Sequence, residues 1–124
     1  MSEPLHLPEK YAAEVRALLR QYIPEAEVWA YGSRVRGDHH EASDLDLVAR
    51  FPATEKRDVF RLAALQEALS ESNLPIIVQI VDWDGIPESF REEIRARYVV
   101  VQKAGGDADG LAVEINRRRI LGRS

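Results

Sequence analysis

The sequence predicts a single α/β or α+β domain in which helices flank a small mixed sheet. Segments with apolar residues at helical spacing alternate with short runs rich in β-branched and aromatic residues. The 124 residues suffice for one hydrophobic core but not for two of ordinary size. A composition that is 45% hydrophobic and 31% charged is typical of a folded globular domain, and it argues against disorder or a membrane span.

The first half of the chain predicts one helix and two strands. Apolar residues recur at helical spacing between Pro8 and Pro24, which indicates an amphipathic helix. Residues 27–31 (EVWAY) form a short apolar and aromatic run that stops at a glycine, which favours a strand over a helix. Residues 45–49 predict a second strand, preceded by a polar stretch.

The second half predicts two more helices and two more strands. Thr54 is the expected cap of a helix that ends near Asn73. Residues 76–81 are continuous and rich in β-branched side chains, which predicts a buried strand. Residues 84–87 (DGIP) then open a further helix, and residues 98–102 predict the last strand.

Composition changes at residue 104. Residues 1–103 are expected to form the domain, and residues 104–124 a flexible linker (AGGDADG) with a basic tail. The tail contains Arg117, Arg118 and Arg119, a cluster that is usually solvated, with contact to an acidic partner or RNA as the alternative.

The charge balance restricts the ligands. With 17 basic and 21 acidic residues the net charge is −4, the wrong sign for extensive nucleic-acid binding. A polyanionic ligand therefore needs a local binding site for its charge. The absence of cysteine excludes disulfides and thiolate metal sites and fits a cytoplasmic location. The N-terminus, MSEPLHLPEK, lacks the pattern of a secretory signal.

Two aspartates at the beginning of the second predicted strand form a candidate metal site. Asp44 and Asp46 are separated by one residue on a predicted strand, so both carboxylates are expected on the same face. Paired carboxylates repel unless a cation lies between them. Mg²⁺ is the expected cation, because it takes oxygen ligands and its coordination shell is completed by substrate phosphates.

A glycine-serine turn provides a local binding site for phosphate. Gly32 and Ser33 lie where a strand ends and a short helical turn begins. Glycine lets a phosphate approach the backbone, and free N–H groups with the Ser33 hydroxyl can hold its oxygens. Arg34 and Arg36 add positive charge nearby, although at this spacing both are not expected to face one ligand.

Together these motifs resemble the minimal nucleotidyltransferases, the MNT group of the DNA polymerase beta-like nucleotidyltransferase superfamily. That family carries Gly-Ser, ten residues and then Asp-x-Asp, which here are Gly32, Ser33, Asp44 and Asp46. The resemblance covers about residues 10 to 103. It implies the superfamily fold, transfer of AMP from ATP with Mg²⁺ at the two aspartates, and phosphate binding by Gly32 and Ser33 with help from Arg36.

The resemblance also implies a protein partner. Many MNT proteins are antitoxins encoded beside a HEPN ribonuclease toxin and adenylylate one of its tyrosines, which suggests a HEPN partner within a homo- or hetero-oligomer. A non-catalytic antitoxin that neutralises its toxin by contact is the first alternative. Adenylylation of a small molecule is the second, for which so short a chain offers little acceptor pocket.

One residue departs from the family pattern. The superfamily uses a third carboxylate on a neighbouring strand, typically in a segment reading like Val-Asp-Leu-Val-Asp-Trp. Residues 78–83 read Val-Gln-Ile-Val-Asp-Trp, so Gln79 occupies the position of this expected catalytic carboxylate. Asp82 has the opposite parity and is expected on the other face, where it and Asp84 serve as strand-end and capping residues. Because an amide is uncharged and cannot take a proton at neutral pH, we expect a weakened catalytic metal.

The remaining notable side chains have structural interpretations. His39 and His40 lie in a polar loop and are expected to be solvated rather than to bind metal. Trp29 and Trp83 are expected in the core or at an interface, with adenine stacking as the minor alternative.

Overall fold

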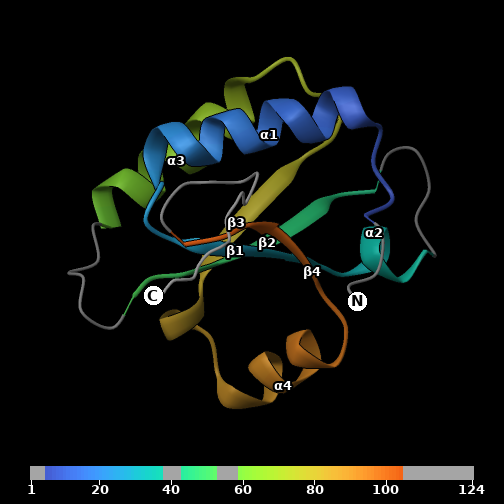
Figure 1. Cartoon of the computed structure of the whole chain (residues 1–124), viewed down its shortest axis with the longest axis vertical. Coiled ribbons are helices and arrows are strands. Elements are labelled where there is room, and N and C mark those ends of the chain that lie inside the picture. Colours follow the sequence, from blue (N-terminus) through green and yellow to red (C-terminus); the bar gives the residue numbers. More distant parts are fainter. Residues whose placement is uncertain (1–4, 38–42, 53–58, 105–124) are drawn as a thin grey trace, which may run out of the picture.

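A four-stranded mixed sheet lies at the centre of the molecule in the order β3-β2-β1-β4 (Figure 1). The computed structural model describes residues 5–37, 43–52 and 59–104. Its helices and strands are, in chain order, α1 (Glu9–Tyr22), β1 (Glu27–Tyr31), α2 (Ser33–Arg36), β2 (Leu45–Arg50), α3 (Val59–Glu71), β3 (Val78–Asp82), the 3₁₀ turn η1 (Trp83–Gly85), α4 (Glu88–Ala96) and β4 (Val99–Gln102). The mixed sheet with flanking helices confirms the predicted fold class.

The register of the sheet aligns three polar side chains. Strand β2 pairs antiparallel with β1 and parallel with β3, while β4 pairs antiparallel with β1. Asp46 lies opposite Tyr31 on one side and opposite Gln79 on the other. Because side chains opposite each other in register point to the same face of a sheet, these three form a row across β1, β2 and β3.

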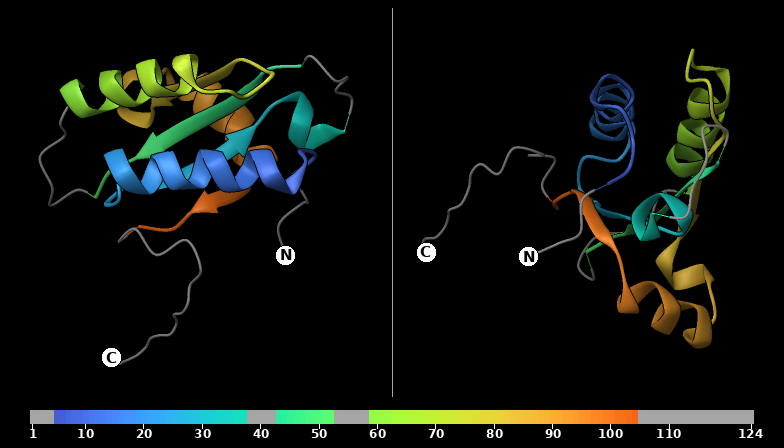
Figure 2. Two further views of the ribbon diagram at one scale, coloured as in Figure 1. Left: turned by 90° about the horizontal axis from the view of Figure 1, so that it is seen from above. Right: turned by 90° about the vertical axis from the view of Figure 1, so that its right-hand side faces the viewer.

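The larger core lies between the sheet and the helices α1 and α3, which run side by side over one face (Figure 2). Leu19 of α1, Leu47 of β2 and Leu65 of α3 are fully buried there. In α1 the buried residues Ala12, Val15 and Leu19 recur at helical spacing, so a single stripe of this helix packs on the sheet.

The smaller core lies on the opposite face, which α4 and η1 cover. Trp29 of β1, Val48 of β2 and Ile94 of α4 form its buried centre. Leu45, Leu47 and Ala49 belong to the other core, so alternation along β2 directs Asp46, Val48 and Arg50 toward the α4 side. The candidate site is therefore on the α4 side of the sheet.

The third strand differs from the sequence prediction. It begins at Val78 rather than at residue 76, and it is an edge strand rather than a strand buried on both faces. Val78 and Ile80 are buried, whereas Gln79 is exposed and 60% of Ile77 is accessible to solvent. Val78 and Ile80 pack in the larger core, and Val81 packs against the smaller core on the opposite face, so Gln79 is the exposed strand residue on the α4 side.

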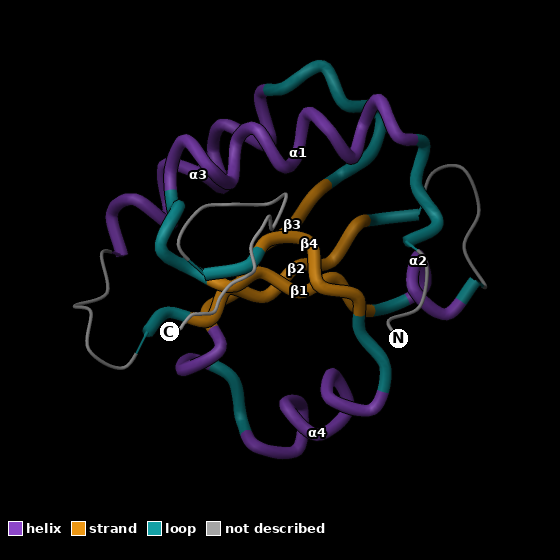
Figure 3. The backbone as a smooth tube through the Cα atoms, in the orientation of Figure 1, coloured by secondary structure: helices purple, strands orange, loops and turns teal. Residues whose placement is uncertain are grey.

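Apart from the predicted start of α3, which lies outside the described residues, the other boundaries agree with the sequence prediction to within two residues, except for the helix expected to open at residues 84–87. There the chain makes the short turn η1, and α4 begins only at Glu88 with Pro87 as its N-cap (Figure 3). No helix in the described ranges has the length and apolarity needed to cross a membrane.

Several predictions fall on residues outside those that the structure describes. These are the cap at Thr54, the histidines His39 and His40, and the basic cluster at residues 117–119. The division of the chain between residues 103 and 104 likewise stays a prediction.

Candidate functional site

The two aspartates of the motif lie at the beginning of β2. Asp44 immediately precedes the strand and is exposed, whereas Asp46 lies within it and is half-buried. Burial raises the pKa of Asp46, the Asp44 carboxylate raises it further, and the Arg36 guanidinium acts in the opposite direction. Because the Asp44 carboxylate disfavours the charge of Asp46, a cation that touches both would be stabilised there.

Gly32 brings the backbone against this carboxylate pair. Its φ of 89° and ψ of −157° belong to a region that is essentially restricted to glycine. A Cβ atom at this position would lie 2.8 Å from Oδ2 of Asp46. The Gly32 carbonyl accepts hydrogen bonds from the N–H groups of Val35 and Arg36, both at 3.0 Å, which starts α2. The predicted phosphate-binding turn, Gly32 and Ser33, is thus adjacent to the predicted metal ligands.

The two arginines of α2 have different surroundings, as their spacing predicts. Arg34 is 4% exposed, and its guanidinium donates to the carbonyl oxygens of Ser43 at 3.0 Å and His6 at 2.9 Å. Arg36 is exposed and close enough to Asp46 to lower its pKa. Arg34 therefore holds the segment just before Asp44, while the charge of Arg36 acts on the Asp46 carboxylate.

Gln79 stands beside Asp46 on β3, in direct register and on the same face. Asp82 cannot replace it, because alternation places Asp82 on the other face, where its Oδ1 accepts a hydrogen bond from the Asp84 N–H at 3.1 Å. The predicted capping role of Asp82 is confirmed, whereas Asp84 lies inside η1 and caps no helix. Within the described ranges no group of three or more potential metal-ligating His, Asp or Glu side chains is present.

Sequence reasoning missed Tyr31, which lies opposite Asp46 in β1. Its ring packs edge-on against Phe90 of α4, with centroids 5.6 Å apart. Burial, followed by the charge of Asp46, raises the pKa of Tyr31 to about 12. The hydroxyl therefore stays protonated and can donate a hydrogen bond toward this end of the sheet. The available signal was its position as the last strand residue before Gly32.

The tryptophans confirm their predicted structural role. Trp29 is 6% exposed and stacks on Tyr98 with ring centroids 3.9 Å apart. Trp83 packs edge-on against Trp29 at 5.4 Å. Both belong to the core on the α4 side, which leaves adenine stacking by Trp29 without an accessible ring face.

The donor set at Asp44, Asp46 and Gln79 fits a partly hydrated cation. Two carboxylates and one amide supply oxygen atoms only, which suits Mg²⁺ better than a soft metal. Two carboxylates are too few for a closed protein cage. Further ligands would have to come from water or from a bound phosphate group.

Comparison with known proteins identifies the family. Residues 12–104 match the family model described as Nucleotidyltransferase domain. The chain is 42% identical over 99 residues to the Probable protein adenylyltransferase MntA of Haemophilus influenzae, covering 80% of this chain and 85% of that protein. The chain therefore belongs to the nucleotidyltransferase domain family, which confirms the resemblance read from its motifs.

Solved structures agree with this assignment. A candidate minimal nucleotidyltransferase is 31% identical with a TM-score of 0.57, over 73% of this chain and 92% of that one. A toxin-antitoxin complex with AMP-PNP contains a chain that is 23% identical with a TM-score of 0.61, over 82% and 81% of the two chains. A complex of tri-AMPylated Shewanella oneidensis HEPN toxin with MNT antitoxin gives 19% identity and a TM-score of 0.59, over 86% and 82%. The last two show a shared fold.

Proposed function

We propose that this chain transfers AMP from ATP to a hydroxyl group of a HEPN-domain toxin, most directly a tyrosine, and acts as its antitoxin. The Haemophilus influenzae relative is named as a protein adenylyltransferase. Similar structures include a toxin-antitoxin complex with AMP-PNP and an AMPylated HEPN toxin bound to an MNT antitoxin. The proposal places the chain in the cytoplasm, in a hetero-oligomer with its toxin, with residues 1–103 carrying the activity.

The close approach of Gly32 to Asp46 is the observation that carries the proposal. A backbone that passes this near a carboxylate allows a triphosphate to touch the Gly32-Ser33 turn and a carboxylate-bound cation together. Asp44 and Asp46 would hold Mg²⁺, which when bound offsets the phosphate charge and orients the reacting phosphate. Gly32 and Ser33 would hold the β- and γ-phosphates, with Arg36 as a further contact.

The reaction forms one bond and breaks one. The acceptor hydroxyl oxygen bonds to the α-phosphorus of ATP, the bond from that phosphorus to the bridging oxygen breaks, and pyrophosphate leaves. The hydroxyl proton passes to water, because the amide of Gln79 has no basic site at neutral pH. We therefore expect a slow transferase.

A second candidate function is neutralisation of the toxin by binding alone. Gln79 favours it, since it leaves only two carboxylates, Asp44 and Asp46, where the resemblance to the superfamily implies three. In this case ATP binding at Asp44 and Asp46 would persist without transfer.

The deciding experiment incubates the chain with ATP labelled at the α-phosphate, Mg²⁺ and the cognate HEPN protein. Label is expected on the HEPN protein with the unmodified chain, and Asp44→Ala should lower it by about 100-fold or more. Gln79→Asp should raise the rate of labelling, whereas Glu92→Gln, an exposed change on α4, should leave it unaltered. If the unmodified chain and Gln79→Asp both transfer nothing while the toxin is still neutralised, transfer is excluded and binding alone stands.

A further inference from the structure

A pocket lies at the opposite end of β2 from the aspartates. It has a volume of about 450 Å³, and its lining includes Arg50, Phe51 and Trp83. Arg50 is four residues beyond Asp46 and on the same face, so the two side chains emerge roughly 13 Å apart along the strand. The pocket is therefore separate from the site proposed for phosphate transfer, and it has the size of a small-ligand site.

Arg50 packs against two indole rings. The centre of its guanidinium lies 4.5 Å from the ring centroid of Trp29 and 4.9 Å from that of Trp83. Its Nε atom is buried, with no hydrogen-bond partner among the described residues. The two ring centroids are themselves 5.4 Å apart, so both indoles lie on one side of the cation. Because Arg50 also lines the pocket, the rest of its planar group is the part left to meet a ligand.

The charged side chains around Arg50 form ion pairs with one another and not with Arg50 among the described residues. Arg91 and Arg95 also lie over Trp83, at 5.5 and 5.3 Å, but both pair with the Glu88 carboxylate. Glu27 lies opposite Arg50 in the register of β1 and β2, but its carboxylate makes no ion pair with Arg50 in the part of the chain that the structure describes, because it accepts the Trp29 indole N–H.

The two acids that line the pocket are directed elsewhere. The Glu27 carboxylate accepts a hydrogen bond from the Trp29 indole N–H at 2.7 Å, and Asp84 lies 4.0 Å from the Arg91 guanidinium. A partly buried cation without an anion is costly, and an anionic ligand would offset that cost.

We infer that this pocket binds a carboxylate attached to an apolar or aromatic group. The planar Arg50 guanidinium matches the two oxygens of a carboxylate, and Phe51 with Trp83 offers apolar surface for the attached group. Glu27 and Asp84 at the lining repel a doubly charged phosphate more strongly than a singly charged carboxylate. The carboxylate can belong to a free small molecule or to an acidic residue of a protein.

The chain offers a direct spectroscopic readout, because it contains only two tryptophans and both contact Arg50. The full ¹⁵N-labelled chain is titrated with benzoate while the two indole N–H signals are followed. Both signals should shift and saturate. Benzamide, which has the same shape without the charge, should produce no saturable shift.

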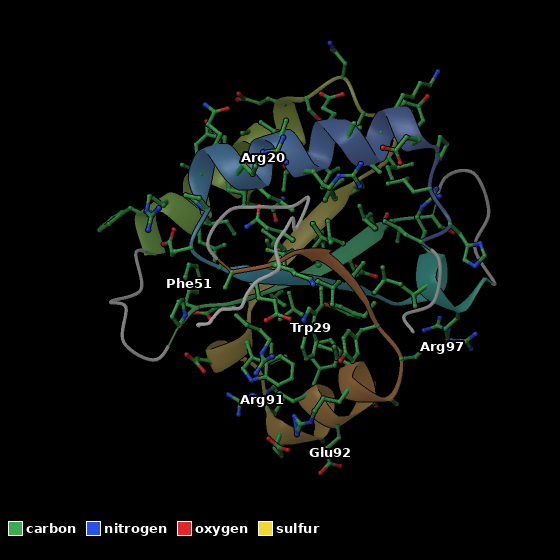
Figure 4. The ribbon with its side chains drawn as sticks, viewed as in Figure 1. Arg20, Trp29, Phe51, Arg91, Glu92 and Arg97 are labelled. Carbon is green, nitrogen blue, oxygen red and sulfur yellow. The ribbon has the colours of Figure 1, made fainter. Side chains whose placement is uncertain are left out.

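Two variants test the role of Arg50. Arg50→Lys keeps the charge but loses the planar edge, and it should weaken benzoate binding at least about 10-fold. Arg20→Lys is the matched control, since Arg20 lies on α1 at the other face of the molecule from Trp29 and Arg91 (Figure 4). It should bind benzoate as the unmodified chain does.

A capped peptide, acetyl-Leu-Glu-Leu-amide, distinguishes the two sources. Tighter binding of this peptide than of benzoate assigns the pocket to a protein partner, and the reverse order assigns it to a small molecule. The inference is wrong if neither probe saturates, if benzamide or inorganic phosphate matches benzoate, or if Arg50→Lys binds benzoate unchanged. Should Arg50→Lys fail to fold, the comparison of benzoate with benzamide on the unmodified chain decides.

Discussion

Asp46 occupies a position that disfavours its own charge, and this has a consequence for stability. Burial and the Asp44 carboxylate raise the pKa of Asp46 above its usual value of 3.8, so the folded chain holds this proton more tightly than the unfolded chain does. Stability is therefore lost as the pH rises through the range just above 3.8, and the full penalty is present at neutral pH.

Replacing the Asp46 carboxylate with a neutral amide should remove the stability cost of its charge. Asp46→Asn should raise the melting temperature at pH 7 in the absence of divalent metal, and it should give no gain at a pH below the usual range of an aspartate. Thermal unfolding of both proteins between pH 3.5 and 7 measures the difference. Glu92→Gln, which alters an exposed carboxylate, serves as the control. A less stable Asp46→Asn protein at pH 7 would contradict the prediction.

Gly32 should tolerate no side chain. Its φ of 89° with ψ of −157° excludes other residues, and a Cβ would lie 2.8 Å from the Asp46 carboxylate. We expect Gly32→Ala to lower the free energy of unfolding by about 1–3 kcal/mol and to weaken ATP binding. Urea denaturation and calorimetric titration measure the two effects.

Gly37 provides the matched comparison for this glycine. It also has a positive φ, 92°, but in the left-handed helical region, and its nearest atom to a new Cβ is a His6 ring nitrogen at 3.4 Å. Gly37→Asn should therefore be tolerated with little loss, because asparagine adopts this conformation readily. Equal effects of the two substitutions would show that Gly32 has no special role.

At this scale the sequence predicts what depends on near neighbours. Strand alternation is enough to place Asp44 and Asp46 together, and the glycine-serine turn follows the strand directly. Tyr31 was missed because its place beside Asp46 depends on how β1 and β2 pair, which no local pattern encodes. The neighbourhood of Gln79 and Asp46 likewise depends on strand register, and only the family resemblance indicated it.

At the scale of elements, helix α3 protects the open edge of the sheet. Gln66 of α3 donates to the Val78 carbonyl and accepts from the Ile80 N–H, both at 2.9 Å, so it satisfies the outward backbone groups of β3. Gln102 acts similarly below α1, where it donates to the carbonyls of Ile23 and Ala26.

Removing this cover should cost stability and solubility. Gln66→Ala leaves two backbone groups of an edge strand unpaired, so we expect a loss of about 1–3 kcal/mol in unfolding free energy and some self-association through β3. Urea denaturation and size-exclusion chromatography give the two readouts. Glu67→Ala changes the exposed neighbour and should alter neither. Should both variants behave alike, the side-chain bridge has no energetic role.

Strand β3 shows which property of an element the local sequence does not predict. A run of β-branched residues predicts that a strand forms at residues 76–81, since that preference is local. Whether the strand is central or at an edge depends on which strands flank it, and among the described strands β3 has a partner on one side only. Exposure of Ile77 and Gln79 follows from this position and not from their residue types.

At the scale of the whole molecule, an acidic chain must bind an anion. The net charge of −4 and the paired carboxylates both repel free ATP, and among the described residues Arg36 is the cation that lowers the pKa of Asp46. Binding of ATP should therefore require a divalent cation. This requirement is independent of the toxin and of the pocket at Arg50, so it tests the nucleotide site alone.

The corresponding measurement is a thermal shift with four ligand conditions: Mg²⁺ alone, ATP with chelator, ATP with Mg²⁺, and adenosine with Mg²⁺. Only ATP with Mg²⁺ should raise the melting temperature substantially, by roughly 5–10 °C when the ligand is at 100 times its dissociation constant. The double variant Asp44→Asn with Asp46→Asn should lose that shift. An equal shift with ATP in chelator would mean that cationic side chains, and not the two aspartates, hold the triphosphate.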